Sequence, residues 1–262
     1  MPDILYAFTL TLLAGLATAV GGLIAFKRGG ASPAFLAGAL GFSAGAMLFV
    51  SLGELFSQAR ETLSSALGDD RGGWAALFAL LAGILLIAAI DRLVPSAANP
   101  HGPALEGEEA QARAALMRAG TFTAAAIVIH NVPEGFATFI VAMENPALAV
   151  PVAAAIAIHN IPEGIAVAVP IRAATGSKGK AFSWALFSGL AEPIGAVVGF
   201  ALLMPFLSET LLGVTFAMVA GVMVFVCIDE LMPTAHRYDV KHIPVYGMVT
   251  GMLVMGASLQ LL

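Results

Sequence analysis

Long apolar stretches alternate with short polar gaps along almost the whole chain. Eight stretches are long enough to cross the hydrocarbon core of a bilayer, which takes about 20 helical residues. They cover residues 4–26, 34–57, 73–94, 121–142, 146–170, 181–204, 211–232 and 243–262. Each run is continuous, whereas the strands of a membrane barrel alternate over segments of about 10 residues. The pattern therefore predicts an all-α membrane protein, a bundle of eight transmembrane helices.

Composition supports one membrane domain over residues 1–262. Of the 262 residues, 59% are apolar and 11% are charged, whereas a soluble domain carries about 25% charged residues. The expected partner is thus the lipid bilayer, and a soluble enzyme is excluded. A net charge of −5 offers no basic face, which excludes a nucleic-acid partner. Cys227 is the only cysteine, so a thiolate metal cluster is excluded too.

The distribution of lysine and arginine predicts the orientation. The end of span three and the gaps after odd-numbered spans hold Arg92, Lys27, Arg28, Arg113, Arg118, Arg172, Lys178, Lys180, Arg237 and Lys241. The gaps after even-numbered spans hold only Arg60 and Arg71. Because cytoplasmic loops are enriched in positive charge, we expect both termini on the extracytoplasmic side of the cell (inner) membrane. The longest gap, about 95–120, is then a cytoplasmic loop whose last part, Ala110 to Arg118, is expected to be helical.

A six-residue motif, H-N-x-P-E-G, occurs in both span four and span five. The two copies are His130-Asn131-Val132-Pro133-Glu134-Gly135 and His159-Asn160-Ile161-Pro162-Glu163-Gly164. Residues four apart share one face of a helix, so each histidine lies over the glutamate of its own motif. Each proline removes a backbone N–H and crowds the carbonyl four residues earlier. We therefore expect kinked spans four and five at the centre of the bundle.

The polar residues of the motif lie at the depth where charge is most costly. With a rise of 1.5 Å per residue, His130 lies about 14 Å into span four from Thr121, and Glu163 lies about 14 Å from Arg172, at the cytoplasmic end of span five. Glu192 in span six reaches the same level. Because each charge at the bilayer centre costs about 2.5–3.5 kcal/mol or more, three carboxylates there require a bound cation. The alternative is a purely structural polar network that joins spans four to six.

Imidazole, carboxylate and amide oxygen together suit a borderline divalent metal such as zinc, iron(II), manganese, cobalt or cadmium. Bridging carboxylates from two facing helices can hold two such ions. One ion would lie on the histidine side and the other on the asparagine side. The predicted metal ligands are His130, Asn131, Glu134, His159, Asn160, Glu163 and Glu192.

At the twin motif the sequence resembles the ZIP family of divalent-metal transporters, most closely its bacterial ZupT branch. Ala191-Glu192-Pro193 and Asp229-Glu230-Leu231-Met232-Pro233 also resemble the family pattern. The resemblance covers the whole chain and implies uptake of zinc into the cytoplasm, often with other divalent metals, through a binuclear site. It implies one metal on Asn131, Glu134, Asn160, Glu163 and Glu192. It implies a second metal on Glu134, His159 and Glu163, with His130 beside it.

Several other residues have two open interpretations. Glu54 in span two either lines the entrance to the metal path or reaches the interface. Asp229 and Glu230 in span seven either receive departing metal or snorkel to the interface. His236, His242 and the loop residue His101 are expected to be ordinary loop histidines, and Asp91-Arg92 to be an interfacial ion pair. Glycine pairs four apart, at Gly41/Gly45, Gly195/Gly199 and Gly247/Gly251, predict close helix contacts and permit a homodimer.

Divalent transition metals are therefore the predicted transported substrate, with no catalytic cofactor. A selective metal channel of the same fold is the alternative, because a channel and a carrier can share ligands. A metalloprotease requires H-E-x-x-H, and here asparagine follows each histidine, so we do not expect an enzyme. A proton-coupled carrier of an organic solute would leave the two His-Asn sets without a role.

Overall fold

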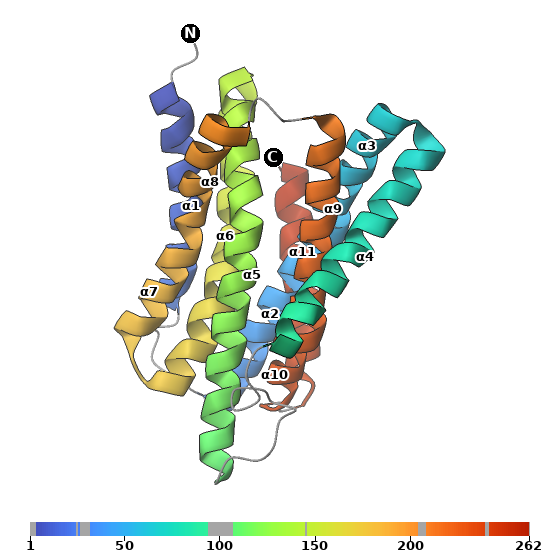
Figure 1. Cartoon of the computed structure of the whole chain (residues 1–262). Helices are drawn as coiled ribbons and strands as arrows, with labels where there is room; N and C mark the ends of the chain where they lie inside the picture. The colour runs from blue at the N-terminus through green and yellow to red at the C-terminus, as the bar shows by residue number, and fades with distance from the viewer. Residues whose placement is uncertain are drawn as a thin grey trace.

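The structure is a computed structural model that describes residues 4–24, 26, 32–93, 107–144, 146–203, 208–238 and 241–261. Within these ranges the regular secondary structure is entirely helical. Figure 1 shows long helices that run side by side, with the ends of α1 and α11 toward one side of the molecule. We call this the terminal side, and the opposite side, where α5 begins, the loop side. The all-α prediction is confirmed.

The helices match the predicted spans, and three spans contain a π-helical segment (η) in which the helix locally widens. Span one is α1 (Ile4–Ile24), span three is α4 (Asp69–Leu93), span four is α5 (Glu108–Glu144), span five is α6 (Pro146–Thr175) and span eight is α11 (Ile243–Leu261). Span two joins α2 (Pro33–Val50), η1 (Ser51–Leu55) and α3 (Phe56–Leu67). Span six joins α7 (Lys178–Gly189), α8 (Ala191–Val198) and η3 (Gly199–Leu203). Span seven joins α9 (Glu209–Phe225), η5 (Val226–Leu231) and α10 (Met232–His236).

Seven of these spans are long and apolar enough to cross a membrane, and α11 contributes a shorter apolar helix. Helix α5 begins well before residue 121, so the predicted helical segment from Ala110 to Arg118 is confirmed. His101 and most of the predicted loop lie outside the described residues. Helices α5 and α6 continue through Pro133 and Pro162 without a break, and the kinks at these prolines stay a prediction.

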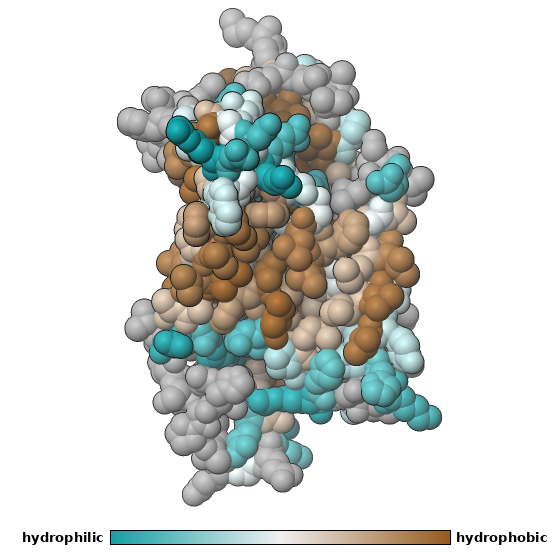
Figure 2. Space-filling view, turned by 90° about the vertical axis from the view of Figure 1, so that its right-hand side faces the viewer, coloured by the Kyte–Doolittle hydropathy of each residue, from teal (hydrophilic) through white to brown (hydrophobic). Residues whose placement is uncertain are grey.

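On the face shown in Figure 2, an apolar belt lies between two polar ends. Its side chains include Trp74, Phe78 and Leu85 of α4, which are all more than 60% exposed. In water such a surface would be unfavourable, but in a bilayer it faces lipid chains. The fold is therefore that of a multi-pass membrane protein.

The helices form two groups that meet along the middle of the molecule (Figure 1). In the first group α1, α5, α6, α7 and α8 pack on one another, and in the second group α2 packs on α11 while α3 and α4 pack on α9. The two groups touch where α2 meets α6 and where α5 meets α9 and η5. Both copies of the motif lie in the first group and close to this boundary.

Glycine makes the contact between α2 and α11 possible. A Cβ atom at Gly41 or Gly45 would collide with the backbone of α11, and one at Gly247 or Gly251 would collide with the backbone of α2. The predicted close contacts are thus confirmed, and Gly195 similarly lies against the backbone of Val132 in α5. Because these glycines pack against helices of the same chain, they do not support a homodimer. The homodimer stays a prediction.

Candidate metal centre

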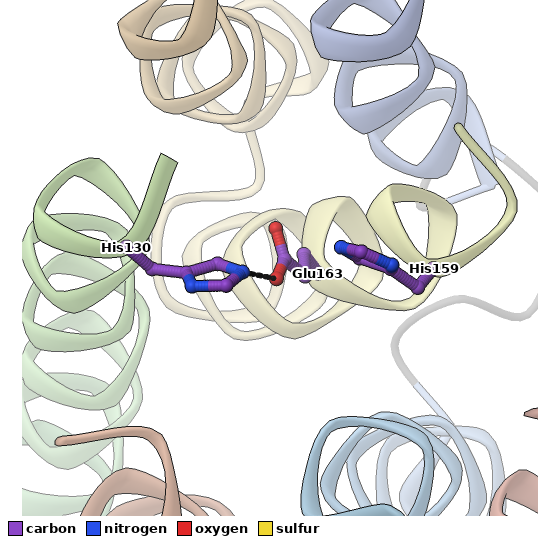
Figure 3. Close-up of side chains that lie close together, drawn as sticks. All are labelled: His130, His159 and Glu163. Carbon is purple, nitrogen blue, oxygen red and sulfur yellow. Dashed lines mark ion pairs between the residues drawn. The ribbon is translucent and has the colours of Figure 1, made fainter. Parts of the chain in front are cut away.

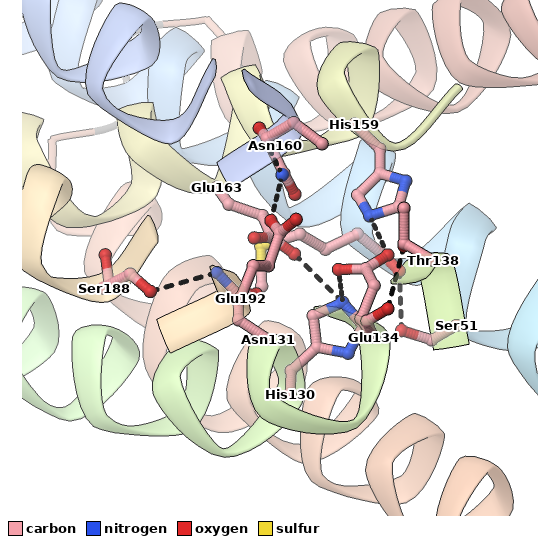
Figure 4. A network of polar contacts seen from close by, with 12 residues as sticks. Ser51, His130, Asn131, Glu134, Thr138, His159, Asn160, Glu163, Ser188 and Glu192 are labelled. Carbon is pink, nitrogen blue, oxygen red and sulfur yellow. Dashed lines mark hydrogen bonds and ion pairs between the residues drawn. The ribbon is translucent and has the colours of Figure 1, made fainter. Parts of the chain in front are cut away.

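All seven predicted ligands converge at one place between α5, α6 and α8 (Figure 4). Each is buried, and the most exposed, Glu134, has only 8% of its surface accessible. We call this set the twin-motif cluster: His130, Asn131 and Glu134 of α5, His159, Asn160 and Glu163 of α6, and Glu192 of α8. The seven side chains therefore lie together, and their role as metal ligands stays a prediction.

The glycine that ends each motif explains how a third helix approaches so closely. A Cβ atom at Gly135 would collide with the backbone of Glu192, and one at Gly164 would collide with the carbonyl oxygen of Thr18 in α1. Without these side chains, α8 contacts α5 and α1 contacts α6 at backbone distance. The motif therefore supplies both the ligands and the space for the neighbouring helices.

Glu192 is placed by a break in its own span. Pro193 has no N–H to donate to the carbonyl of Gly189, which favours a break at this point. Helix α7 ends at Gly189 and α8 starts at Ala191. Glu192 is consequently in the first turn of α8, where the positive end of the helix dipole favours a carboxylate.

The imidazoles and carboxylates of the two motifs contact one another directly. His159 Nε2 lies 2.7 Å from Glu134 Oε1. His130 Nε2 lies 3.3 Å from Glu134 Oε2 and 3.4 Å from Glu163 Oε1. Figure 3 shows Glu163 between the two rings, and the ligand atoms of His130, His159 and Glu163 all lie within 4.8 Å of one another. This spacing allows one cation to be shared by nitrogen and oxygen ligands.

The two asparagines are oriented by backbone carbonyl groups. Asn131 Nδ2 donates to the carbonyl oxygen of Ser188 at 3.1 Å, and Asn160 Nδ2 donates to that of Ala14 at 2.9 Å. Asn160 Nδ2 also donates to Glu192. Because the amide nitrogens are engaged, the Oδ1 atoms are left as free acceptors. Sequence analysis could not identify Ser188 or Ala14, since both act through backbone carbonyl groups.

Several buried oxygen atoms of the cluster have no hydrogen-bond partner among the described residues. They are Asn131 Oδ1, Glu134 Oε2, Asn160 Oδ1, Glu163 Oε2 and Glu192 Oε2. A buried polar atom without a partner costs about 1–3 kcal/mol. The cluster contains three carboxylates and neither lysine nor arginine. A bound cation would balance the negative charge of the carboxylates and give the unpartnered oxygen atoms a ligand.

A pocket of about 180 Å³ opens beside the cluster on the terminal side. Glu134 and His159 line it, together with residues of α5 and α6 nearer the terminal side and residues of α2, η1, α3 and α9. On the loop side, buried apolar side chains from α2, α5, α6 and α7 pack together, among them Leu36, Ile127 and Val167. The cluster thus lies at the base of a pocket that faces the terminal side.

A second buried ionic group lies near the loop side, and the sequence did not reveal it. Arg118 Nε lies 3.1 Å from Glu230 Oε1, and the same guanidinium pairs with Asp91 of α4. We call Asp91, Arg118 and Glu230 the inner ion cluster. The expected pairing of Asp91 with Arg92 is wrong, because Asp91 forms its ion pair with Arg118 of α5 and none with Arg92 among the described residues. Snorkelling by Glu230 is also wrong, since this residue is 2% exposed.

The remaining candidates stay apart from the twin-motif cluster. Asp229 lies next to the inner ion cluster, and its carboxylate is within 4.8 Å of those of Asp91 and Glu230. His236 is exposed, and its Nδ1 lies 2.8 Å from the carbonyl oxygen of Met232. His242 follows in the turn before α11 and has a positive φ of 61°. Glu54 lines the pocket on the terminal side.

Comparison with known proteins gives a consistent result. The family model for the ZIP zinc transporters matches residues 93–258. The zinc transporter ZupT of Corynebacterium efficiens is 60% identical over 264 residues, which cover 99% of this chain and 98% of that protein. ZupT of Corynebacterium glutamicum is 56% identical over 262 residues, with 98% and 99% covered. ZupT of Streptococcus mutans is 51% identical over 255 residues, with 97% of each chain covered.

Proposed function

The chain belongs to the ZIP family of zinc transporters, and we propose that it carries zinc into the cytoplasm through the twin-motif cluster. It is thus a membrane transporter and not an enzyme. The terminal side is then extracytoplasmic, in agreement with the lysine and arginine count. An inside-negative potential favours entry of a divalent ion by about 4.6 kcal/mol per 100 mV, at roughly 2.3 per charge.

The observation that carries this proposal is the unbalanced charge of the cluster. Glu134, Glu163 and Glu192 bring three carboxylates to the membrane interior, and only two imidazoles face them. Imidazole nitrogen and carboxylate oxygen are the ligands that zinc takes in proteins besides thiolate. A zinc ion would therefore meet fitting ligands and remove the cost of the unpaired acceptors.

The arrangement supports two metal positions that share the motif glutamates. On the histidine side, Glu134 contacts both His130 and His159, and Glu163 contacts His130. On the other side Asn160 bonds to Glu192, and both asparagines leave Oδ1 free. Glu134 and Glu163 lie between the two sets and would bridge the metals. The same ligands also suit iron(II), manganese, cobalt and cadmium, which we propose as further substrates.

Alternating access is the mechanism that fits a pocket on one side and apolar packing on the other. Zinc would enter from the terminal side, and release would require the packed residues of the loop side to separate. A selective channel of the same fold is the second candidate, because it can use the same ligands. The two differ in kinetics, since a carrier saturates with substrate while a channel flux follows the potential.

Zinc tracer uptake into proteoliposomes with an imposed inside-negative potential tests this function. We expect saturable uptake by the wild-type chain and a loss of roughly 100-fold or more in Glu163→Ala, because a bridging ligand is removed. Glu209→Ala is the matched control, since Glu209 is exposed at the start of α9. Uptake without saturation would favour the channel. Absence of flux for zinc, iron and manganese would overturn the proposal.

A further inference from the structure

The pocket on the terminal side has a distinctive lining, and we call it the outer pocket. Its polar residues are Glu54, Gln58, Glu134, Thr138 and His159, and its other described lining residues are apolar. Two of the polar residues are carboxylic acids, and the described lining contains neither lysine nor arginine. Apolar walls around negative charge concentrate the electric field in a cleft. The outer pocket is therefore suited to cations.

Glu54 is the acidic residue of the outer pocket that is not part of the repeated motif. It lies in the π-helical turn η1, between α2 and α3. Its side chain is partly buried, and Oε2 is fully covered without a hydrogen-bond partner among the described residues. Removing a carboxylate from water is costly unless a cation or donor compensates for it. π-helical turns within helices often occur at functional sites. The position of Glu54 in such a turn therefore agrees with a role in binding a ligand.

Gln58, one helical turn beyond Glu54, is exposed toward the terminal side, whereas Glu134 and His159 lie at the inner end of the pocket. Glu54 therefore stands between the opening and the twin-motif cluster. A hydrated cation that enters must pass its carboxylate before it reaches the first imidazole. The interface alternative for Glu54 is less consistent with this position, since a snorkelling side chain would have its charged end in water.

We propose that Glu54 is a loading residue, the first carboxylate to hold the entering divalent cation before His159 and Glu134 take it over. The inference deepens the proposed function and rests on it for the identity of the ion and the direction of entry. The proposal adds a third cation position, which lies nearer the terminal side than the two metal positions proposed in the twin-motif cluster. A loading residue governs capture, so its loss should affect apparent affinity more than the maximal rate.

The test is zinc uptake into proteoliposomes by Glu54→Gln, an isosteric change that removes only the charge. We expect KM to rise about ten-fold while kcat stays within about two-fold of the wild-type value. Glu61→Gln is the matched control, because Glu61 is also acidic but lies exposed on α3 outside the outer pocket. Its KM should not change. Equal KM values in all three proteins, or equal rises in both variants, would overturn the proposal.

Glu54→Asp covers the case in which the glutamine variant folds poorly. It retains a carboxylate, so its KM should lie closer to that of the wild type than to that of Glu54→Gln. A KM as high as in Glu54→Gln, or a fall in kcat at unchanged KM, would contradict a loading role. Thermal unfolding of the purified variants checks that each retains the fold.

A second measurement does not depend on transport. In equilibrium dialysis with zinc, Glu54→Gln should bind one weakly held ion fewer than the wild type, and Glu61→Gln should match the wild type. Equal stoichiometry in the three proteins would overturn the loading position. The two proposals fail separately: full uptake by Glu163→Ala contradicts the twin-motif route, whereas unchanged kinetics in Glu54→Gln contradicts only the loading residue.

Discussion

Two buried ionic clusters lie along α5, and they differ in the source of positive charge. Residue 118 of the inner ion cluster precedes residue 130 of the twin-motif cluster by 12 positions, about 18 Å along the helix. In the inner ion cluster a single guanidinium faces two carboxylates, Asp91 and Glu230. In the twin-motif cluster three carboxylates face only imidazole and amide groups. Asp91 and Glu230 are thus compensated by a cation of the chain itself, whereas the carboxylates of the twin-motif cluster have no lysine or arginine beside them among the described residues.

The two clusters also connect different parts of the molecule. The twin-motif cluster lies within the helix group of α5, α6 and α8, whereas the inner ion cluster joins α5 to α4 and η5 of the other group. Arg118 is 3% exposed, and its guanidinium also lies 5.6 Å from the ring centroid of Phe122. The inner ion cluster is therefore a contact between the two groups, made by charges that the chain itself carries.

Removal of the Arg118 guanidinium should have the largest effect, because it leaves the acids of the inner ion cluster without a cation from the chain, as in the twin-motif cluster. Arg118→Ala leaves Asp91 and Glu230 close together without a partner, and the loss of one member of a buried ion pair costs about 3–5 kcal/mol. We expect a marked decrease in the unfolding temperature of the detergent-purified protein. Arg92→Ala is the control, because Arg92 is exposed at the end of the same helix as Asp91, and it should change stability by less than about 0.5 kcal/mol.

The double variant Arg118→Met/Glu230→Gln separates charge from packing. It removes the guanidinium together with its more deeply buried carboxylate partner, so it should be more stable than Arg118→Ala. A double variant no more stable than Arg118→Ala would mean that packing of the arginine side chain, and not ionic pairing, holds the two helix groups together here.

The contrast between the clusters also shows what the sequence can reveal. The twin motif could be recognised because each copy lies within six consecutive residues, with the histidine four positions before the glutamate. A carboxylate at that depth in the membrane also needs a positive partner. Arg118 and Glu230 are 112 positions apart, so no local pattern joins them, and Arg118 counted only toward orientation. A local pattern also predicts an ion pair between Asp91 and its neighbour Arg92, because the true partner, Arg118, is 27 positions away.

Continuous apolar runs predicted the eight helices but not their internal breaks. The π-turn at Ser51–Leu55 and the interruption at Leu190 occur inside spans whose overall apolar character continues on both sides of the break. Pro193 was a visible signal for the second of these, through the carbonyl it leaves free at Gly189. The asparagine orientation was beyond prediction, because it depends on the backbone carbonyls of Ser188 and Ala14.

Added zinc should sharpen the comparison, since the proposed function assigns a bound cation to the twin-motif cluster, whereas Arg118 already pairs with two acids of the inner ion cluster. A ligand that binds the folded state alone stabilises it by about 2.7 kcal/mol at 100 times its Kd. We expect zinc to raise the unfolding temperature of the wild type and of Arg118→Lys, and to have little effect on Glu163→Ala. Magnesium at the same concentration is the control, because it prefers sites made entirely of oxygen ligands. An equal zinc effect in Glu163→Ala would place the stabilising ion elsewhere.

The smallest effect on the free energy of unfolding is expected from Arg118→Lys, which keeps the positive charge but replaces the planar guanidinium. Arg118 reaches Glu230 through Nε and Nη2 and Asp91 through Nη2, a planar geometry that a lysine ammonium does not reproduce. Arg118→Lys should lose about 1.5 kcal/mol, the value of one hydrogen bond to a charged group, and should therefore unfold between the wild type and Arg118→Ala. Urea unfolding at fixed detergent concentration measures the difference. A lysine variant as unstable as Arg118→Ala would show that geometry outweighs charge in the inner ion cluster, and that an internal cation compensates buried acids only when it fits both of them.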